Sequence, residues 1–246
     1  MPSDTETPSL ISEEIEDVLP MKDFNCRECG RTFKSMVLHL FGRELLPDRA
    51  CPDCVEAREA EIAMENSEQD NSMLRAEWIA ICPPLYRKTD RKRLSKPLLN
   101  AVDAFEGNDS MGIVGKPGAG KTRAAFLALK RMHLQGKRCA YINGSQFNAQ
   151  VANKAADFPE LRDQAHSILR NIRDAQFLLL DDVGKQRFTS ASEQELYDLL
   201  EHRTSFLKPI IWTTNSTAKD LQGRISKDRG DAVIRRLTED SKIVKV

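Results

Sequence analysis

One eight-residue segment carries the residue types that bind phosphate. It follows the pattern Gly-x-x-x-x-Gly-Lys-Thr and consists of Gly115, Lys116, Pro117, Gly118, Ala119, Gly120, Lys121 and Thr122. Glycines let backbone N–H groups close around a phosphate chain, and a helix starting at the segment would point its positive end at the same anion. Lys121 would reach the β- and γ-phosphates, and the Thr122 hydroxyl would hold Mg²⁺. The segment therefore predicts a site for ATP and Mg²⁺.

The sequence on either side of this segment agrees with such a site. An apolar run at 111–114 precedes it, and a helix-favouring stretch at 123–135 follows it. A chance glycine turn is the alternative, but a chance turn requires neither a strand before it nor a helix after it. We therefore favour the nucleotide site.

Two acidic residues follow a second apolar run. Residues 177–180 are all apolar and lead directly into Asp181 and Asp182. A strand buried on both faces delivers the residues at its C-terminal end to the sheet edge where the phosphate-binding segment lies. We expect Asp181 to bind Mg²⁺ through water and Asp182 to act as general base for the attacking water. A helix-capping role would explain either acid alone but explains the pair poorly.

A third strand-like stretch, at residues 210–214, leads into the polar residue Asn215. Its side chain could orient a water near the γ-phosphate, or it could cap a helix that begins near Thr217. We favour the first interpretation, because the expected layout places Asn215 beside Asp182.

Four cysteines form two matched pairs with metal-binding spacing. Cys26 and Cys29 make one pair, Cys51 and Cys54 make the other, and 21 residues separate the pairs. Four thiolates complete a tetrahedral Zn²⁺ shell, and the metal would supply folding energy to a segment too short for a sufficient core. A redox pair or unrelated buried cysteines are the alternatives. Cys82 and Cys139 stand alone, and we expect both to be small buried hydrophobes.

Composition and charge pattern divide the chain into four parts. The 246 residues carry no formal net charge, no long apolar segment and no secretion-signal pattern, which predicts a cytoplasmic protein without a membrane span. We expect an acidic disordered tail at 1–20, a zinc-binding module at 21–58, a helical and basic linker at 59–96 and an ATPase domain at 97–246. A short docking helix is the alternative for the tail. The helix at 55–80 is expected to break near 66–72.

Strand-like and helix-like stretches alternate through the last part of the chain. This alternation is typical of an α/β fold in which crossover helices connect a parallel sheet. The expected strands are residues 111–114, 138–142, 177–180, 210–214 and 242–246.

Residues from about 83 to 246 resemble the AAA+ ATPases of the DnaC/DnaI helicase-loader and IstB transposition-helper group. The matching segments are the phosphate-binding segment and residues 177–184, 210–217 and 232–237. The resemblance implies an ASCE-type P-loop fold with a five-stranded parallel sheet flanked by helices. It makes Lys121 and Thr122 the Walker A residues, Asp181 and Asp182 the Walker B acids, and Asn215 sensor 1.

The same resemblance implies that the chain associates with itself. In this group an arginine in the helix before the last strand reaches the γ-phosphate of a neighbouring subunit, and Arg236 matches that position best. A basic helix end that offsets the helix dipole is the alternative. Two features depart from the wider AAA+ pattern. Asp182 replaces the usual Glu, which could slow hydrolysis, and no C-terminal lid is expected because the last strand ends at Val246.

Three hypotheses for the function remain open. The first is a DNA-replication ATPase that loads a replicative helicase onto single-stranded DNA. The second is an ATPase that assists a transposase, and the third is a nucleotide-gated adaptor with negligible turnover. Residues 184–189 mix basic and aromatic side chains that could hold single-stranded DNA, although Phe188 could equally anchor this loop to its own domain. The basic stretch 87–96 could contact phosphates or simply be solvated. Arg203 is expected either to be solvated or to pair across a subunit boundary.

Overall fold

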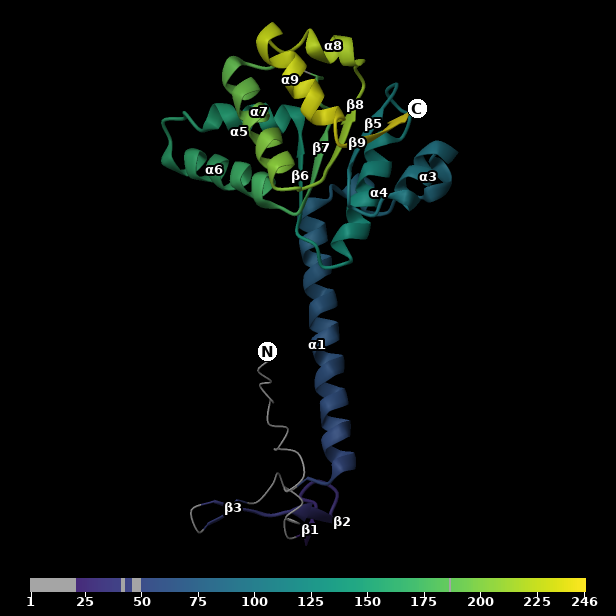
Figure 1. Cartoon of the computed structure of the whole chain (residues 1–246), viewed down its shortest axis with the longest axis vertical. Coiled ribbons are helices and arrows are strands. Elements are labelled where there is room, and N and C mark those ends of the chain that lie inside the picture. The colour runs from purple at the N-terminus through teal and green to yellow at the C-terminus, as the bar shows by residue number, and fades with distance from the viewer. Residues whose placement is uncertain (1–20, 41–42, 46–49, 186) are drawn as a thin grey trace, which may run out of the picture. The chain divides into compact units, whose positions relative to one another are not determined.

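The computed structural model describes residues 21–40, 43–45, 50–185 and 187–246 (Figure 1). The chain separates into two compact units, Met1–Asp70 and Asn71–Val246. The expected acidic tail at 1–20 lies outside the described residues. Within the described part of the chain, no helix is both long enough and apolar enough to cross a membrane.

The first unit contains two small antiparallel hairpins and the start of a long helix. Strand β1 (Met21–Asn25) pairs with β2 (Thr32–Met36), and β3 (Leu38–Leu40) pairs with β4 (Arg43–Leu45). Helix α1 (Pro52–Ile81) then runs for 30 residues. The expected break at 66–72 is wrong. The Asn, Ser and Asp residues there each lower helix propensity by well under about 1 kcal/mol, and the good helix formers around them let the helix continue through them.

The second unit is built around one parallel sheet. Its five strands lie in the order β6-β7-β8-β5-β9, and every neighbouring pair is parallel, as the sequence predicts. The strands are β5 (Ser110–Val114), β6 (Cys139–Asn143), β7 (Phe177–Asp181), β8 (Ile210–Thr214) and β9 (Ser241–Lys245). The helices are α2 (Pro84–Arg87), α3 (Lys96–Ala104), α4 (Lys121–His133), α5 (Gly144–Asn153), α6 (Pro159–Asp174), α7 (Ser190–Ser205), α8 (Ala218–Gln222) and α9 (Lys227–Thr238), with a 3₁₀ turn at Arg91–Arg93.

Alternate residues of the central strands feed two separate hydrophobic cores, one on each face of the sheet. Along β7, Leu178 and Leu180 pack with residues of α5, α6, α7 and α9. Between them, Leu179 packs with residues of α3 and α4 on the other face. Figure 1 shows these two sets of helices on opposite sides of the strands. Burial on both faces explains why β7 is a continuous apolar run in the sequence.

The strand order decides where the functional residues meet. Strands β7, β8 and β5 are consecutive in the sheet, so their carboxyl ends lie side by side at one edge. The phosphate-binding segment follows β5, the two acids end β7, and Asn215 follows β8. Open parallel sheets bind ligands at this edge.

At the other edge of the sheet, a buried arginine binds the backbone just before the amino ends of β7 and β8. Arg203 of α7 is fully buried, and its guanidinium donates to five backbone carbonyls. The acceptors are the carbonyl oxygens of Ile172, Arg173, Ala175, Gln176 and Pro209, at 2.8–3.3 Å. Burial lowers the pKa of Arg203 to about 10, so the side chain remains a cation at neutral pH. Neither expectation for Arg203, solvation or pairing across a subunit boundary, is correct.

Candidate functional site

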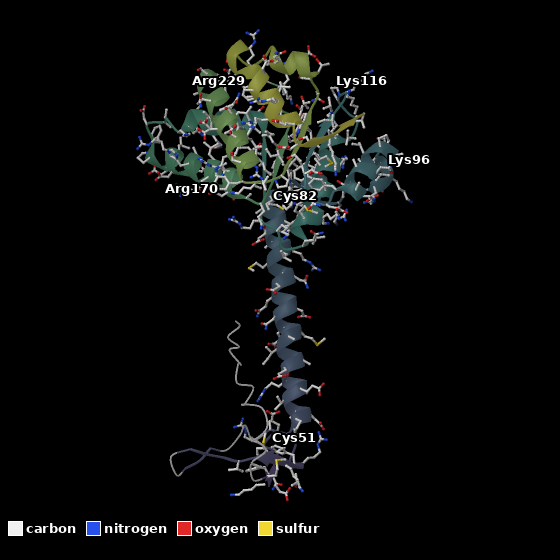
Figure 2. The ribbon with its side chains drawn as sticks, viewed as in Figure 1. Cys51, Cys82, Lys96, Lys116, Arg170 and Arg229 are labelled. Atoms are coloured by element: carbon white, nitrogen blue, oxygen red, sulfur yellow. The ribbon has the colours of Figure 1, made fainter. Side chains whose placement is uncertain are left out.

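The phosphate-binding segment forms the loop between β5 and α4. Gly118 and Gly120 have φ of 81° and 87°, a left-handed conformation that costs glycine little and strains other residues. Helix α4 begins at Lys121, so its first backbone N–H groups and the positive end of its dipole face this loop. Lys116, labelled in Figure 2, belongs to the same loop.

Lys121 is held inside the loop by three acceptors. Its side chain is 5% exposed. Its Nζ donates to the carbonyl oxygens of Gly115 and Lys116, at 3.0 and 2.8 Å, and to Oδ1 of Asn215, at 2.6 Å. Burial lowers the pKa of Lys121, while the nearby acids oppose this shift. A bound phosphate would therefore replace one or more of these acceptors as the hydrogen-bond partner of the Lys121 ammonium.

The two residues expected to hold Mg²⁺ are in direct contact. Thr122 Oγ1 lies 2.9 and 3.2 Å from the two carboxylate oxygens of Asp181. Asp181 is 5% exposed, and burial raises its pKa, whereas hydrogen bonds from Thr213 and Thr122 lower it. Mg²⁺ is usually held by one or two protein oxygens together with phosphates and water. A hydroxyl and a carboxylate beside a phosphate-binding loop fit that ligand set.

Asn215 links the second acid to the lysine. Its Nδ2 donates to Asp182 Oδ1 at 3.0 Å, while its Oδ1 accepts from Lys121. Asp182 adopts a left-handed backbone with φ of 54°, and the Lys185 ammonium lies 4.0 Å from its Oδ2. The alternative that Asn215 caps the next helix is not supported. Thr217 serves there instead, accepting from the backbone N–H of Asp220 at 3.1 Å.

The four paired cysteines converge in the first unit. The sulfur atoms of Cys26, Cys29, Cys51 and Cys54 all lie within 4.8 Å of one another, and the Sγ atoms of Cys29 and Cys51 are 3.6 Å apart. Four thiolates about 2.3 Å from one Zn²⁺ in a tetrahedron would have their sulfurs about 3.8 Å apart. Cys51, labelled in Figure 2, is buried and begins the second pair.

Hydrogen-bond donors favour the thiolate form of Cys26 and Cys29, whereas hydrogen bonds with Cys29 and Cys51 raise the pKa of Cys54. The backbone N–H groups of Cys29 and Cys51 lower the pKa of Cys26 to about 6, and the Cys51 N–H lies 3.2 Å from the Cys26 sulfur. The backbone N–H of Arg31 and then its Nε, which donates to the Cys29 sulfur at 3.4 Å, lower the pKa of Cys29. Because metal-binding cysteines must be deprotonated, these contacts fit a zinc site. Cys82 and Cys139, by contrast, are isolated and buried, as expected.

Comparison with known proteins decides the family. The sequence pattern of the "IstB-like ATP binding protein" family matches residues 85–246. The chain belongs to this family. The IstB-like chain is also 23% identical over 121 residues to the replicative helicase loader DnaC of Escherichia coli strain K12, an alignment that covers 49% of this chain and 48% of DnaC. It therefore spans about half the length of the DnaC relatives that it matches.

A further relative and two solved structures extend the comparison. The uncharacterized protein YdaV of Escherichia coli strain K12 is 24% identical over 182 residues, covering 67% of this chain and 72% of YdaV. A crystal structure of DnaI superposes with a TM-score of 0.57 at 13% identity, covering 67% of this chain and 94% of that one. The DnaC helicase loader gives 0.50 at 20% identity, covering 69% and 98%. These two likenesses support the AAA+ P-loop fold of the IstB-like chain.

Arg236 is not part of the hydrogen-bonded group at the sheet edge. It lies on α9, and its Nη2 forms an ion pair with Glu201 Oε2 of α7 at 2.5 Å. Glu239 is a second, more distant partner, at 3.9 Å. Any contact of Arg236 with a neighbouring subunit would have to compete with this intramolecular pair.

The basic and aromatic loop after β7 is partly anchored to its own domain. Phe188 packs against the core that contains α5 and α7, so its ring is not freely available for base stacking. The carbonyl oxygens of Lys185 and Arg187 accept from Arg224 Nη1 at 2.8 Å and from Asn148 Nδ2 at 3.2 Å. Gln186 lies outside the described residues. The exposed cations that this loop offers are Lys185 and Arg187.

Part of the basic stretch at 87–96 has a structural role. Arg87 donates to the carbonyl oxygens of Cys82 and Ile79, both at 2.8 Å, and so satisfies the C-terminal end of α1. Arg91 Nη2 donates to both carboxylate oxygens of Asp103, at 2.7 and 2.8 Å. These two side chains are already engaged within the chain.

The sequence interpretation missed one residue that contacts both acids. Thr213, which is fully buried on β8, donates to Asp181 and accepts from the backbone N–H of Asp182. Two consecutive threonines before Asn215, at the end of an otherwise apolar strand, were the available signal. A buried hydroxyl requires a partner, and the acids at the end of β7 supply one.

Proposed function

We propose that this IstB-like chain is an ATP-hydrolysing DNA-replication protein that loads or remodels a replicative helicase on single-stranded DNA. The observation that carries the ATPase part is the hydrogen-bonded group formed by Lys121, Asn215 and Asp182 beside Thr122 and Asp181. These side chains lie at or just after the carboxyl ends of three neighbouring strands, β7, β8 and β5, and meet at the edge where the phosphate-binding loop lies. Membership of an ATP-binding family supports the same assignment.

Each residue of the group has a defined task in this proposal. Lys121 binds the β- and γ-phosphates, and Thr122 and Asp181 hold Mg²⁺, which would neutralise charge on the phosphates. Asp182 orients the attacking water and accepts its proton, and Asn215 fixes the position of that carboxylate. Replacing Asp182 with Asn should preserve ATP binding and lower turnover by about 10²–10⁴-fold. Normal hydrolysis by Asp182→Asn would assign the base to another residue.

We propose that Asp182 sets a slow rate. Its side chain is one methylene shorter than the Glu usual at this position, so it holds water less closely to the phosphate. If so, Asp182→Glu raises turnover. The left-handed backbone complicates this test, because Asp tolerates positive φ better than Glu. Thermal melting of both variants would separate a strained fold from slow chemistry.

The helicase and DNA partners rest on the DnaC match and on the exposed cations Lys185 and Arg187. The test is ATP turnover with and without single-stranded DNA, combined with pull-down of a purified replicative helicase. Stimulation by DNA and retention of the helicase are expected. The family match also favours a transposase-assisting ATPase, for which a transposase would be retained instead. ATP binding without turnover would favour the nucleotide-gated adaptor.

We also propose that neighbouring subunits complete the site through Arg236. An arginine supplied by a neighbour can accelerate phosphoryl transfer by several orders of magnitude. Turnover per chain should then rise with protein concentration. Mixing Arg236→Ala chains with Lys121→Ala chains should restore some activity, because one type of junction would pair an intact Lys121 with an intact Arg236. Turnover that is independent of concentration, with no rescue on mixing, would indicate that Arg236 serves only its pair with Glu201.

For the rest of the chain we propose a zinc-binding module at 21–58 and a helical, basic linker at 59–96, before an ATPase domain at 97–246. The converging sulfurs support the module. Metal analysis of the purified protein tests it, with one Zn²⁺ per chain expected.

A further inference from the structure

Thr213 connects the two acids at the end of β7. Its Oγ1 donates to Asp181 Oδ1 at 2.6 Å and accepts from the backbone N–H of Asp182 at 3.0 Å. The side chain is fully buried. One hydroxyl therefore contacts the carboxylate expected to hold Mg²⁺ and the backbone of the residue expected to position water.

The backbone at Asp182 explains why this second contact matters. Asp182 has φ of 54°, an unfavourable conformation for a residue with a side chain. The backbone N–H of the next residue, Val183, donates to the Thr213 carbonyl at 2.8 Å. Thr213 thus holds the turn through both its carbonyl and its hydroxyl. Of these two groups, only the hydroxyl also contacts a carboxylate, that of Asp181.

We infer that Thr213 is a positioning residue for the ATPase reaction: its hydroxyl fixes the Asp181 carboxylate toward the Mg²⁺ site and fixes the backbone that presents Asp182. Thr213 does not touch nucleotide itself. Outer-shell partners of this kind orient metal ligands, and their loss typically lowers metal affinity or activity 10–100-fold. The inference rests on the proposed ATPase function.

The neighbouring threonine provides a matched control. Thr214 is also buried, and its hydroxyl donates to the Val183 carbonyl at 2.6 Å and accepts from the Ser216 N–H at 3.0 Å. Thr213→Val and Thr214→Val each remove one buried hydroxyl with little change of shape. Only the first change removes a contact with the acids.

The experiment measures binding of a fluorescent, non-hydrolysable ATP analogue by the full chain, in EDTA and across a Mg²⁺ titration. In EDTA the variants should bind within about twofold of the unmodified protein, which reports an intact loop. The Mg²⁺ concentration that gives half of the full increase in analogue affinity should rise about tenfold in Thr213→Val. It should stay within about twofold of the unmodified protein's value in Thr214→Val and return towards that value in Thr213→Ser. The turnover number should fall in Thr213→Val, with little change in the KM for ATP at saturating Mg²⁺.

Different outcomes would refute the positioning role of Thr213 and the proposed ATPase function. An equal Mg²⁺ requirement in Thr213→Val and Thr214→Val, or no recovery in Thr213→Ser, would refute the positioning role. If Thr213→Val loses binding in EDTA, Thr213→Ala replaces it in the same comparison with Thr213→Ser. Analogue binding by the unmodified protein that ignores Mg²⁺ would contradict the proposed function itself.

Discussion

The nucleotide site and the cysteine cluster differ in what holds their reactive groups in place. At the nucleotide site the polar side chains bind one another, because the amide of Asn215 accepts from Lys121 and donates to Asp182. Two hydrophobic cores hold the strands beneath them. Among the described residues around the cysteine cluster, the buried core consists of Cys26, Ala50 and Cys51, and two of these three residues are themselves candidate ligands.

This difference indicates two ways of preparing a binding site. A large core can hold polar groups in place before the ligand binds, provided that these groups form hydrogen bonds with one another. A very small core cannot, and the ligand then contributes folding energy directly. We therefore expect removal of ligand to leave the second unit folded and to unfold the first.

The largest effect should follow loss of zinc from the first unit. The double change Cys26→Ser and Cys51→Ser removes one ligand from each pair, and metal binding in such modules is worth on the order of 10 kcal/mol. Proteolysis should then cleave within residues 21–58, while ATP-analogue affinity is unchanged. Metal analysis and mass spectrometry of the fragments provide the measurement. Zinc retained by the double variant would refute this ligand set.

The next largest effect should come from Arg203 in the second unit. Arg203→Met leaves five backbone carbonyls without their donor in a buried position, and we expect a loss of about 3–5 kcal/mol in the free energy of unfolding. Exposed Arg173→Met is the control and should change it by less than about 0.5 kcal/mol. Denaturant unfolding measures both. Equal losses of unfolding free energy in the two variants would mean that the buried guanidinium does not stabilise the sheet.

Lys121→Ala should have a smaller effect, confined to ligand binding. It removes a charge-assisted phosphate contact, and ATP affinity should fall at least about tenfold, or about 1.4 kcal/mol. Lys137→Ala, an exposed lysine after α4, is the control. Calorimetric titration gives the affinities. Unchanged ATP affinity in Lys121→Ala would contradict the assignment of the phosphate-binding loop.

Glu201→Gln should have the smallest effect. The Arg236–Glu201 pair is partly exposed, with 21% and 39% of the two side chains accessible, so solvent screens it. Removing the charge should cost less than about 1 kcal/mol of unfolding free energy, measured in urea. A loss above about 2 kcal/mol would show that the second unit depends on this contact as well as on its hydrophobic cores.

Local patterns in the sequence predicted the sheet and the residues at its edge. Apolar runs of strand length, each ending in a polar residue, identify Asp181 and Asn215, and the glycine spacing identifies the loop around Lys121. Contacts between distant segments were not predictable in this way. Arg203 appeared to be an exposed helix end because four of its five acceptors lie about 30 residues earlier in the chain. Thr213 was missed for the same reason, because its partner Asp181 lies 32 residues earlier.

The bonds of Lys121 have a consequence for nucleotide exchange. When a nucleotide leaves, the carbonyl oxygens of Gly115 and Lys116 and the amide oxygen of Asn215 can take back the ammonium. Loss of nucleotide would therefore not leave the buried Lys121 ammonium without a hydrogen-bond partner, a costly state that would oppose nucleotide release.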